Sequence, residues 1–138
     1  MSIRKQIRAK IKTILLNTTS AGANVYSGRT TPLWQAELPA ILIYTREEPS
    51  ERLDRGGEKL LRNCQVAIEA RVRLPADSSL DDTLDDLAQE IEDKIEADET
   101  LGGLALHSTL LNTEIDVTAE GERELGAIRL TYAMAYTT

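Results

Sequence analysis

Large apolar residues alternate with small or polar ones along residues 126–136, close to the end of the chain. The apolar positions of this stretch are Ile128, Leu130, Tyr132, Met134 and Tyr136. A period of two predicts a β-strand with one large apolar face and one small or polar face. The strand must pair into a sheet, because its two tyrosines otherwise have no core to join.

Three other segments also have strand patterns. Alternation over residues 62–74, which stops at Pro75, and over residues 110–118 predicts two further strands. The almost unbroken apolar run over residues 38–45 predicts a strand that is covered on both faces. Pro39 fits only at the beginning of this strand, because proline has no amide to donate to a neighbouring strand.

Two segments carry apolar residues at helical spacing. Residues 3–17 repeat isoleucine and leucine every three or four positions, and Ser2 is placed to cap the first turn. Residues 80–97 repeat leucine, isoleucine and alanine in the same way, after Ser78 or Ser79. Each segment predicts an amphipathic helix whose apolar stripe needs a sheet face to cover it.

Residues 46–61 have no usable period, and we expect a long loop there, of the kind that tends to be functional or mobile. Together with the next residue the segment holds five basic and five acidic side chains. These candidate interface residues are Arg46, Glu47, Glu48, Glu51, Arg52, Asp54, Arg55, Glu58, Lys59 and Arg62. Such a segment is either a solvated loop or a device that fixes the registry between neighbouring subunits.

These elements predict a single domain over residues 1–138 with an α+β fold. A short strand begins near residues 25–26, and the last two strands are joined by a short turn, which makes them antiparallel. We expect a mostly antiparallel sheet of four to five strands, two helices packed on one face, and a long charged loop.

Charge is distributed unevenly along the 138 residues, whose net charge is −7. The negative total argues against a general nucleic-acid binder. The predicted first helix is basic, whereas residues 80–99 hold ten carboxylates against Lys94 alone. Either both charged segments are helix faces exposed to solvent, or their opposite charges attract. In the second case they join one copy of the chain to another copy or to a charged partner. No apolar run approaches the roughly 20 residues that cross a bilayer, and we expect neither a membrane span nor a secretory signal.

Catalytic chemistry is not visible in the sequence. Cys64 and His107 are the only thiol and the only imidazole. Cys64 alternates in phase with Val66, so we expect it on the buried face, where a thiol behaves as a small hydrophobe. The carboxylates of residues 81–86 suggest at most a loose surface site for Mg²⁺ or Ca²⁺, because successive helical positions point in different directions. We therefore expect neither an enzyme nor a cofactor or metal site.

Five short motifs follow one another in a distinctive order. The first is an apolar strand at residues 38–44 that begins with Leu-Pro-Ala and ends with Tyr, and the second is Glu-Arg-Leu-Asp at 51–54. The third is a strand at 68–76 that ends in Leu-Pro-Ala. The last two are Leu-Asp-Asp at 80–82 and Leu-Thr-Tyr at 130–132, which is followed by Tyr136. In this order and spacing the chain resembles the tail terminator proteins of long-tailed bacteriophages, the family of lambda-type minor tail protein U. The resemblance extends over most of the chain from about residue 29.

The resemblance implies a small α+β subunit that assembles as a hexameric ring on the head-proximal end of a phage tail tube. Such proteins stop tube polymerisation and provide the surface for head–tail joining, and they have no known catalytic residues. The implied partners are other copies of the chain, the tail tube protein and a head completion or connector protein. The implied location is the virion tail, assembled in the host cytoplasm, without nucleic-acid sequence recognition and without a membrane. In this family the long loop contributes to ring contacts, which implies an interface role for residues 46–62.

Two other functions stay open from the residues alone. One is a small cytoplasmic ligand-binding or regulatory α+β module, which needs a concave pocket with convergent polar groups. The other is an enzyme that uses Cys64 with His107, which needs a reactive thiol beside the imidazole.

Overall fold

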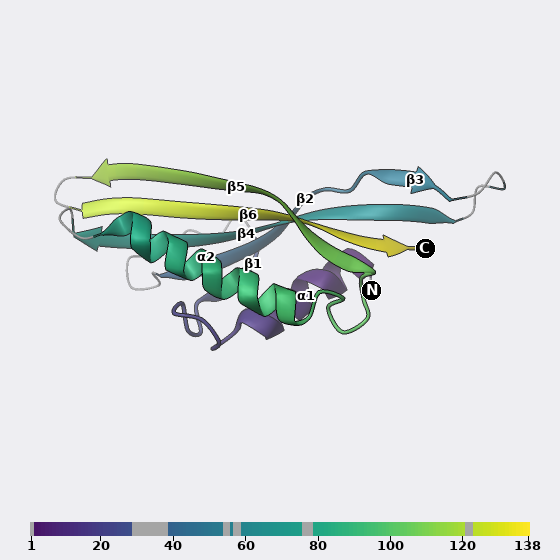
Figure 1. Ribbon diagram of the computed structural model, residues 1–138, viewed down its shortest axis with the longest axis horizontal. Coiled ribbons are helices and arrows are strands. Elements are labelled where there is room, and N and C mark those ends of the chain that lie inside the picture. Colours follow the sequence, from purple (N-terminus) through teal and green to yellow (C-terminus); the bar gives the residue numbers. More distant parts are fainter. Residues whose placement is uncertain (1, 29–38, 54–55, 57–58, 76–78, 121–122) are drawn as a thin grey trace.

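The computed structural model of the chain describes residues 2–28, 39–53, 56, 59–75, 79–120 and 123–138. Two helices lie on one face of a six-stranded sheet, and the described residues place no helix on the opposite face (Figure 1). The predicted α+β class, with both helices on the same side of the sheet, is therefore confirmed.

The helices begin and end close to their predicted limits. Helix α1 spans Ile3–Leu15 and helix α2 spans Leu80–Ala97. Ser2 caps α1, because its hydroxyl accepts a hydrogen bond at 3.2 Å from the backbone amide three residues later. Ser79 precedes α2, but its hydroxyl donates to the Asp82 carboxylate at 2.7 Å instead of accepting from the backbone. No helix in the described part of the chain combines the length and the apolar character needed to span a membrane.

The sheet is antiparallel at every pairing except one. Its strands are β1 (Val25–Ser27), β2 (Ala40–Glu47), β3 (Ser50–Arg52), β4 (Leu60–Pro75), β5 (His107–Glu120) and β6 (Arg123–Thr137). Five of them follow the order β1-β2-β4-β6-β5, and β3 pairs with one end of β4. The parallel pair is β1 with β2. The long strands β4 and β6 form the centre of the sheet, and they pair with each other along almost their whole length.

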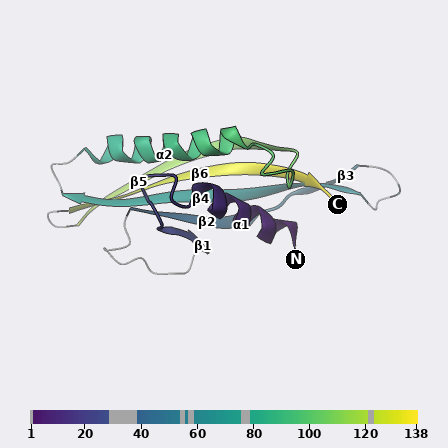
Figure 2. The same cartoon turned by 90° about the horizontal axis from the view of Figure 1, so that it is seen from below.

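The core lies between the helices and one face of the sheet. Alternate residues of the central strands, among them Ile68 and Leu130, point toward the helices and are completely buried. Helix α1 contributes Ile7 and Ile11, which are also completely buried. Helix α1 packs on β1 and β2, and α2 packs on β4 and β6. Figure 2 accordingly shows α1 toward the β1 side of the sheet and α2 toward the β5 side.

Strand β5 forms an edge of the sheet that α2 does not cover. Ile115 and Val117 on this strand are 56% and 48% exposed, although both are apolar. A β-bulge between Leu110 and Asn112 shifts the register and leaves Leu111 without a partner on β6. Long, exposed and apolar edge strands are uncommon in monomeric proteins, because they invite pairing with another chain.

The prediction of a loop over residues 46–61 is wrong in part, and the sheet has one strand more than the predicted four to five. Strand β2 continues to Glu47, β3 pairs antiparallel with β4, and β4 already begins at Leu60. All three residues of β3 are exposed, so no apolar alternation marks the strand in the sequence. We call residues 46–62 the charged arm. Its strand β3 and the paired end of β4 project at one end of the sheet, beyond both helices (Figures 1 and 2).

Candidate functional site

A nearly buried carboxylate fixes the base of the charged arm. Glu48 lies between β2 and β3, and its side chain is only 9% exposed. It accepts hydrogen bonds from Arg4 of α1 at 2.6 Å, Arg62 of β4 at 3.2 Å and the Tyr136 hydroxyl of β6 at 2.5 Å. One carboxylate thus joins the first helix, the arm and the last strand.

Hydrogen bonding keeps Glu48 ionised in this enclosed position. Burial by itself opposes the charged form, but the hydrogen bonds from Tyr136, Arg4 and Arg62 outweigh it, and the net effect lowers the pKa of Glu48. The same cluster raises the pKa of the Tyr136 hydroxyl, through burial first and then through its bond to the carboxylate. The base of the arm therefore carries a fixed negative charge with two cationic partners.

Three exposed charges in the outer part of the arm are not neutralised by any residue that the structure describes. Glu51 and Arg52 on β3 and Lys59 just before β4 are exposed and form no ion pair within the described part of the chain. Of the other predicted interface residues, Glu47 is also exposed. Asp54, Arg55 and Glu58 lie outside the described residues. The structure therefore brings Glu48 and Arg62 together and leaves Glu51, Arg52 and Lys59 exposed.

A second charged cluster occupies the face of the sheet that has no helix. Glu69 of β4 is 4% exposed and accepts hydrogen bonds from Arg71 at 2.6 Å, Arg129 at 3.1 Å and the Tyr44 hydroxyl at 3.1 Å. Glu114 of β5 accepts from Arg129 at 3.3 Å and from Arg46 of the arm at 3.4 Å. The cluster therefore connects the outer edge of the sheet to the charged arm.

Sequence reasoning missed the Glu69 cluster, because alternating polar residues on a strand are also typical of a solvated face. Burial alone would raise the pKa of Glu69, but Arg71, Arg129 and Tyr44 together lower it. This face also carries a small buried apolar cluster of Leu42, Tyr44 and Ala67, with Tyr26 packed against it. The only sequence signal for this apolar cluster was the unbroken apolar run of β2.

The thiol and the imidazole do not form a catalytic pair. Cys64 is completely buried on the helix-covered face, as predicted, and burial raises its pKa to about 11. Strand pairing places Cys64 beside Met134 and His107 beside Ala135. Because Met134 and Ala135 are consecutive residues of one strand, the two side chains lie on opposite faces of the sheet. In the described residues no group of three carboxylate, thiol or imidazole side chains is placed to hold a metal ion.

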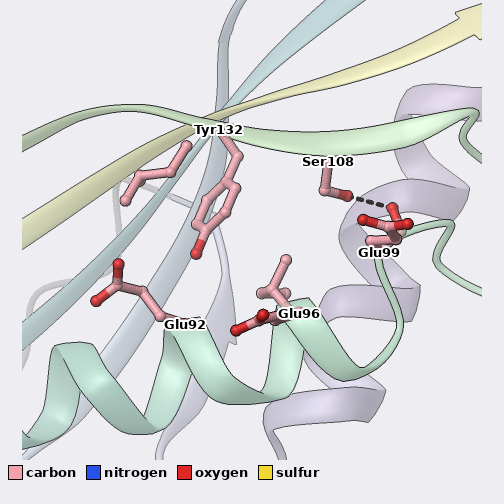
Figure 3. Close-up of a pocket in the computed structure, with 7 residues that line it drawn as sticks. Glu92, Glu96, Glu99, Ser108 and Tyr132 are labelled. Carbon is pink, nitrogen blue, oxygen red and sulfur yellow. Dashed lines mark hydrogen bonds between the residues drawn. The ribbon is translucent and has the colours of Figure 1, made fainter.

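A small cavity opens between the second half of α2 and the strands beside it. Its volume is about 190 Å³, and Figure 3 shows how its polar side chains are arranged. The lining residues are Glu92, Ile95, Glu96, Glu99, Ser108, Leu110 and Tyr132. We call this cavity the acidic groove. The apolar alternation of residues 126–136 predicts Tyr132 in the core, and its ring is indeed buried, but its hydroxyl reaches the groove (Figure 3).

Similarity to known proteins extends over nearly the whole chain. One chain from a solved structure titled "Virion of native gene transfer agent (GTA) particle" is similar, with 8% sequence identity, a TM-score of 0.42, and coverage of 94% of this chain and 95% of that chain. No curated protein matches the chain. The family described as phage minor tail protein U matches residues 2–136, which is nearly the whole chain. The chain therefore belongs to the phage minor tail protein U family and is a structural protein of a phage tail.

Proposed function

We propose that this chain is a tail terminator, which caps the head-proximal end of a phage tail tube as a homohexameric ring. The ring stops tube polymerisation and provides the surface to which a head completion or connector protein attaches. The observation that carries the proposal is the match to the minor tail protein family over residues 2–136. The exposed charges of Glu51, Arg52 and Lys59, which form no ion pair among the described residues, also support it. The ring assembles in the host cytoplasm and remains in the virion.

The physical demands of capping agree with this molecule. A tail tube is an open stack of rings, and every exposed end accepts another layer. A terminator must bind that end with one surface and present a different surface to the next component. A rigid sheet with an arm fixed at Glu48 and charged beyond it meets this demand, since charge pairs set orientation more than they add affinity.

The ten charged residues of the arm are our candidates for contacts between subunits or with the tube. Glu48 and Arg62 belong to the fixed base, so we assign them the role of positioning the arm. Glu51, Arg52 and Lys59 are available for charge pairs with a neighbour. The proposed function is not enzymatic and requires no cofactor.

Negative-stain electron microscopy of the purified chain, with and without tail tubes, tests this proposal. We expect closed rings of six subunits at high concentration, and a single ring at one end of each tube. A matched pair of variants locates the arm contact. Arg52→Glu should weaken ring formation or docking, whereas Lys94→Glu, which makes the same charge change at an exposed position of α2, should not. A chain that forms no ring and binds no tube under any condition would contradict the proposal.

A further inference from the structure

The hydroxyl of Tyr132 has no hydrogen-bond partner among the described residues, although the side chain is almost completely enclosed. Tyr132 is 5% exposed, and its hydroxyl points toward α2 between Glu92 and Glu96 (Figure 3). Burial first, and then the charges of Glu92 and Glu96, raise the pKa of this hydroxyl. It therefore stays neutral, and its oxygen can accept a hydrogen bond from a guest in the groove.

The carboxylates of the acidic groove also lack a counter-ion within the described part of the chain. Glu92, Glu96 and Glu99 form no salt bridge there, and the nearby Lys94 is exposed and also makes none. Like charges gathered around one hydroxyl favour a guest that brings positive charge and hydrogen-bond donors. A lysine ammonium has both properties. The walls also include Leu110, which is 37% exposed and suits an apolar neighbour of the cation.

Helix α1 presents such cations on its outer side. Arg4 bonds to Glu48 and Arg8 bonds to Thr45, so these two cations are already used within the chain. Lys5 and Lys12 make no salt bridge in the described residues, and Lys5 is exposed. They are seven residues apart, which places them on the same side of the helix about 10 Å apart. Leu16, 37% exposed, follows on that same side one turn later.

We propose that the acidic groove of one copy receives Lys5 and Lys12 from helix α1 of a second copy. This inference rests on the proposed ring, and it names the contact that joins its neighbours. Glu92 and Glu96 are one turn apart, about 6 Å along α2, and so present carboxylates in a row that two lysines of one helix can follow. Leu16 of the second copy then packs near Leu110.

The positions of the two surfaces fit a ring. The basic side belongs to the helix that packs on β1 and β2, whereas the groove lies against β5 and β6. The contact therefore joins two different surfaces of the chain, and such heterologous contacts repeat from copy to copy and form a ring when the rotation between neighbouring copies closes. Leu110 belongs both to the exposed apolar residues of β5 and to the groove, so the same contact covers it.

Two charge-reversed variants test the contact. The groove variant carries Glu92→Lys with Glu96→Lys, and the helix variant carries Lys5→Glu with Lys12→Glu. Each alone should raise the protein concentration needed for half-maximal assembly about tenfold or more in sedimentation velocity, because every junction then opposes like charges. An equimolar mixture should recover assembly, since alternating copies restore opposite charges at every junction. The matched control, Asp85→Lys with Asp86→Lys, makes the same charge change on exposed residues of α2 outside the groove and should assemble as the parent does.

The outcomes separate this contact from the proposed function. Rings formed by either variant alone at the parent's concentration, or a mixture that fails to recover, would overturn the contact and leave the terminator proposal standing. Assembly that requires added Mg²⁺, and that the groove variant alone abolishes, would make the occupant a metal ion and would also overturn it. A parent chain that forms no ring with or without tail tubes would overturn both.

Discussion

Glu48 is the residue on which the position of the charged arm depends most. Its carboxylate holds Arg4, Arg62 and Tyr136, which come from three different elements. Losing a carboxylate of this kind costs more than its own hydrogen bonds, because the two guanidinium groups remain without their counter-ion.

Replacing Glu48 by glutamine should lower the free energy of unfolding by about 2 kcal/mol, because the amide keeps the shape of the side chain but removes the charge that both arginines share. Urea unfolding of the parent and the variant measures this difference. Glu51→Gln, an exposed position on β3, is the matched control and should change stability by less than about 0.5 kcal/mol. Equal and small effects at both positions would show that the Glu48 cluster does not hold the arm.

Both enclosed carboxylates make the folded chain sensitive to acid. The pKa values of Glu48 and Glu69 are lowered from the ordinary value of 4.5. A carboxyl group whose pKa is lower in the folded chain than in the unfolded chain stabilises the folded state, and this stabilisation is complete above the pKa of the unfolded chain. It is lost as the pH falls below 4.5 and through the pKa of the folded chain. Urea unfolding at a series of pH values should show the decline, and Glu48→Gln with Glu69→Gln should flatten it. A variant with the same pH dependence as the parent would place the acid sensitivity elsewhere.

The buried thiol gives a further test at the residue scale. Cys64 is completely enclosed and its pKa is raised to about 11, so it is both inaccessible and protonated at neutral pH. Alkylation by iodoacetamide at neutral pH should be slow in the folded chain and become fast in denaturant. Rapid labelling of the folded chain would revive the enzymatic alternative, which needs a reactive Cys64.

At the scale of elements, α2 is held against β6 by a close approach at Gly126. A Cβ atom placed there would lie 2.9 Å from Leu84 Cδ1 and 3.0 Å from Leu80 Cδ2. The absence of a side chain at Gly126 therefore leaves room for these two leucine side chains against the sheet.

Gly126→Ala should destabilise the fold by about 1–3 kcal/mol, because the added methyl group pushes against two buried leucines of α2. Thermal unfolding monitored by circular dichroism measures the loss. Ala127→Ser, one residue later and directed to the opposite face, serves as a control with a small expected effect. An unchanged melting temperature in Gly126→Ala would mean that α2 moves away without cost.

Periodicity predicts an element well when one of its faces is buried, and this explains which elements the sequence predicted. Helix α2 and strand β6 each carry a full apolar stripe or face, and their predicted and observed limits differ by only a few residues. Strand β3 escaped prediction because the strand is short and all its side chains are exposed. The parallel pairing of β1 was also beyond reach, since its three residues carry no sign of direction.

Most contacts of the candidate site could not be predicted from the sequence. The sequence indicated that residues 46–62 carry mixed charges, but it did not indicate that Glu48 is nearly buried or that Glu69 gathers two arginines. These clusters depend on which strands are neighbours, and cross-strand partners far apart in sequence leave no periodic mark. The acidic groove includes Tyr132, which the apolar alternation places in the core. That alternation does not indicate where the tyrosine hydroxyl points.

At the scale of the whole molecule, the described charges divide between separate surfaces. Helix α1, the second half of α2 beside β5, and strand β3 of the charged arm lie on different parts of one sheet-and-helix body (Figures 1 and 2). A subunit of a ring needs two lateral surfaces that match each other and further surfaces for the components above and below. This division of charge gives the chain enough distinct surfaces for that role.

We propose, as the centre of the terminator function, that the chain ends tube growth by occupying the growing end. The most direct measurement is the length of tail tubes, by electron microscopy, when purified tube protein polymerises in the presence of increasing amounts of this chain. Termination at the growing end should make the tubes shorter as the chain is added, and each arrested tube should carry one additional ring at one end. Tubes of unchanged length, or the chain distributed along the tube walls, would contradict it.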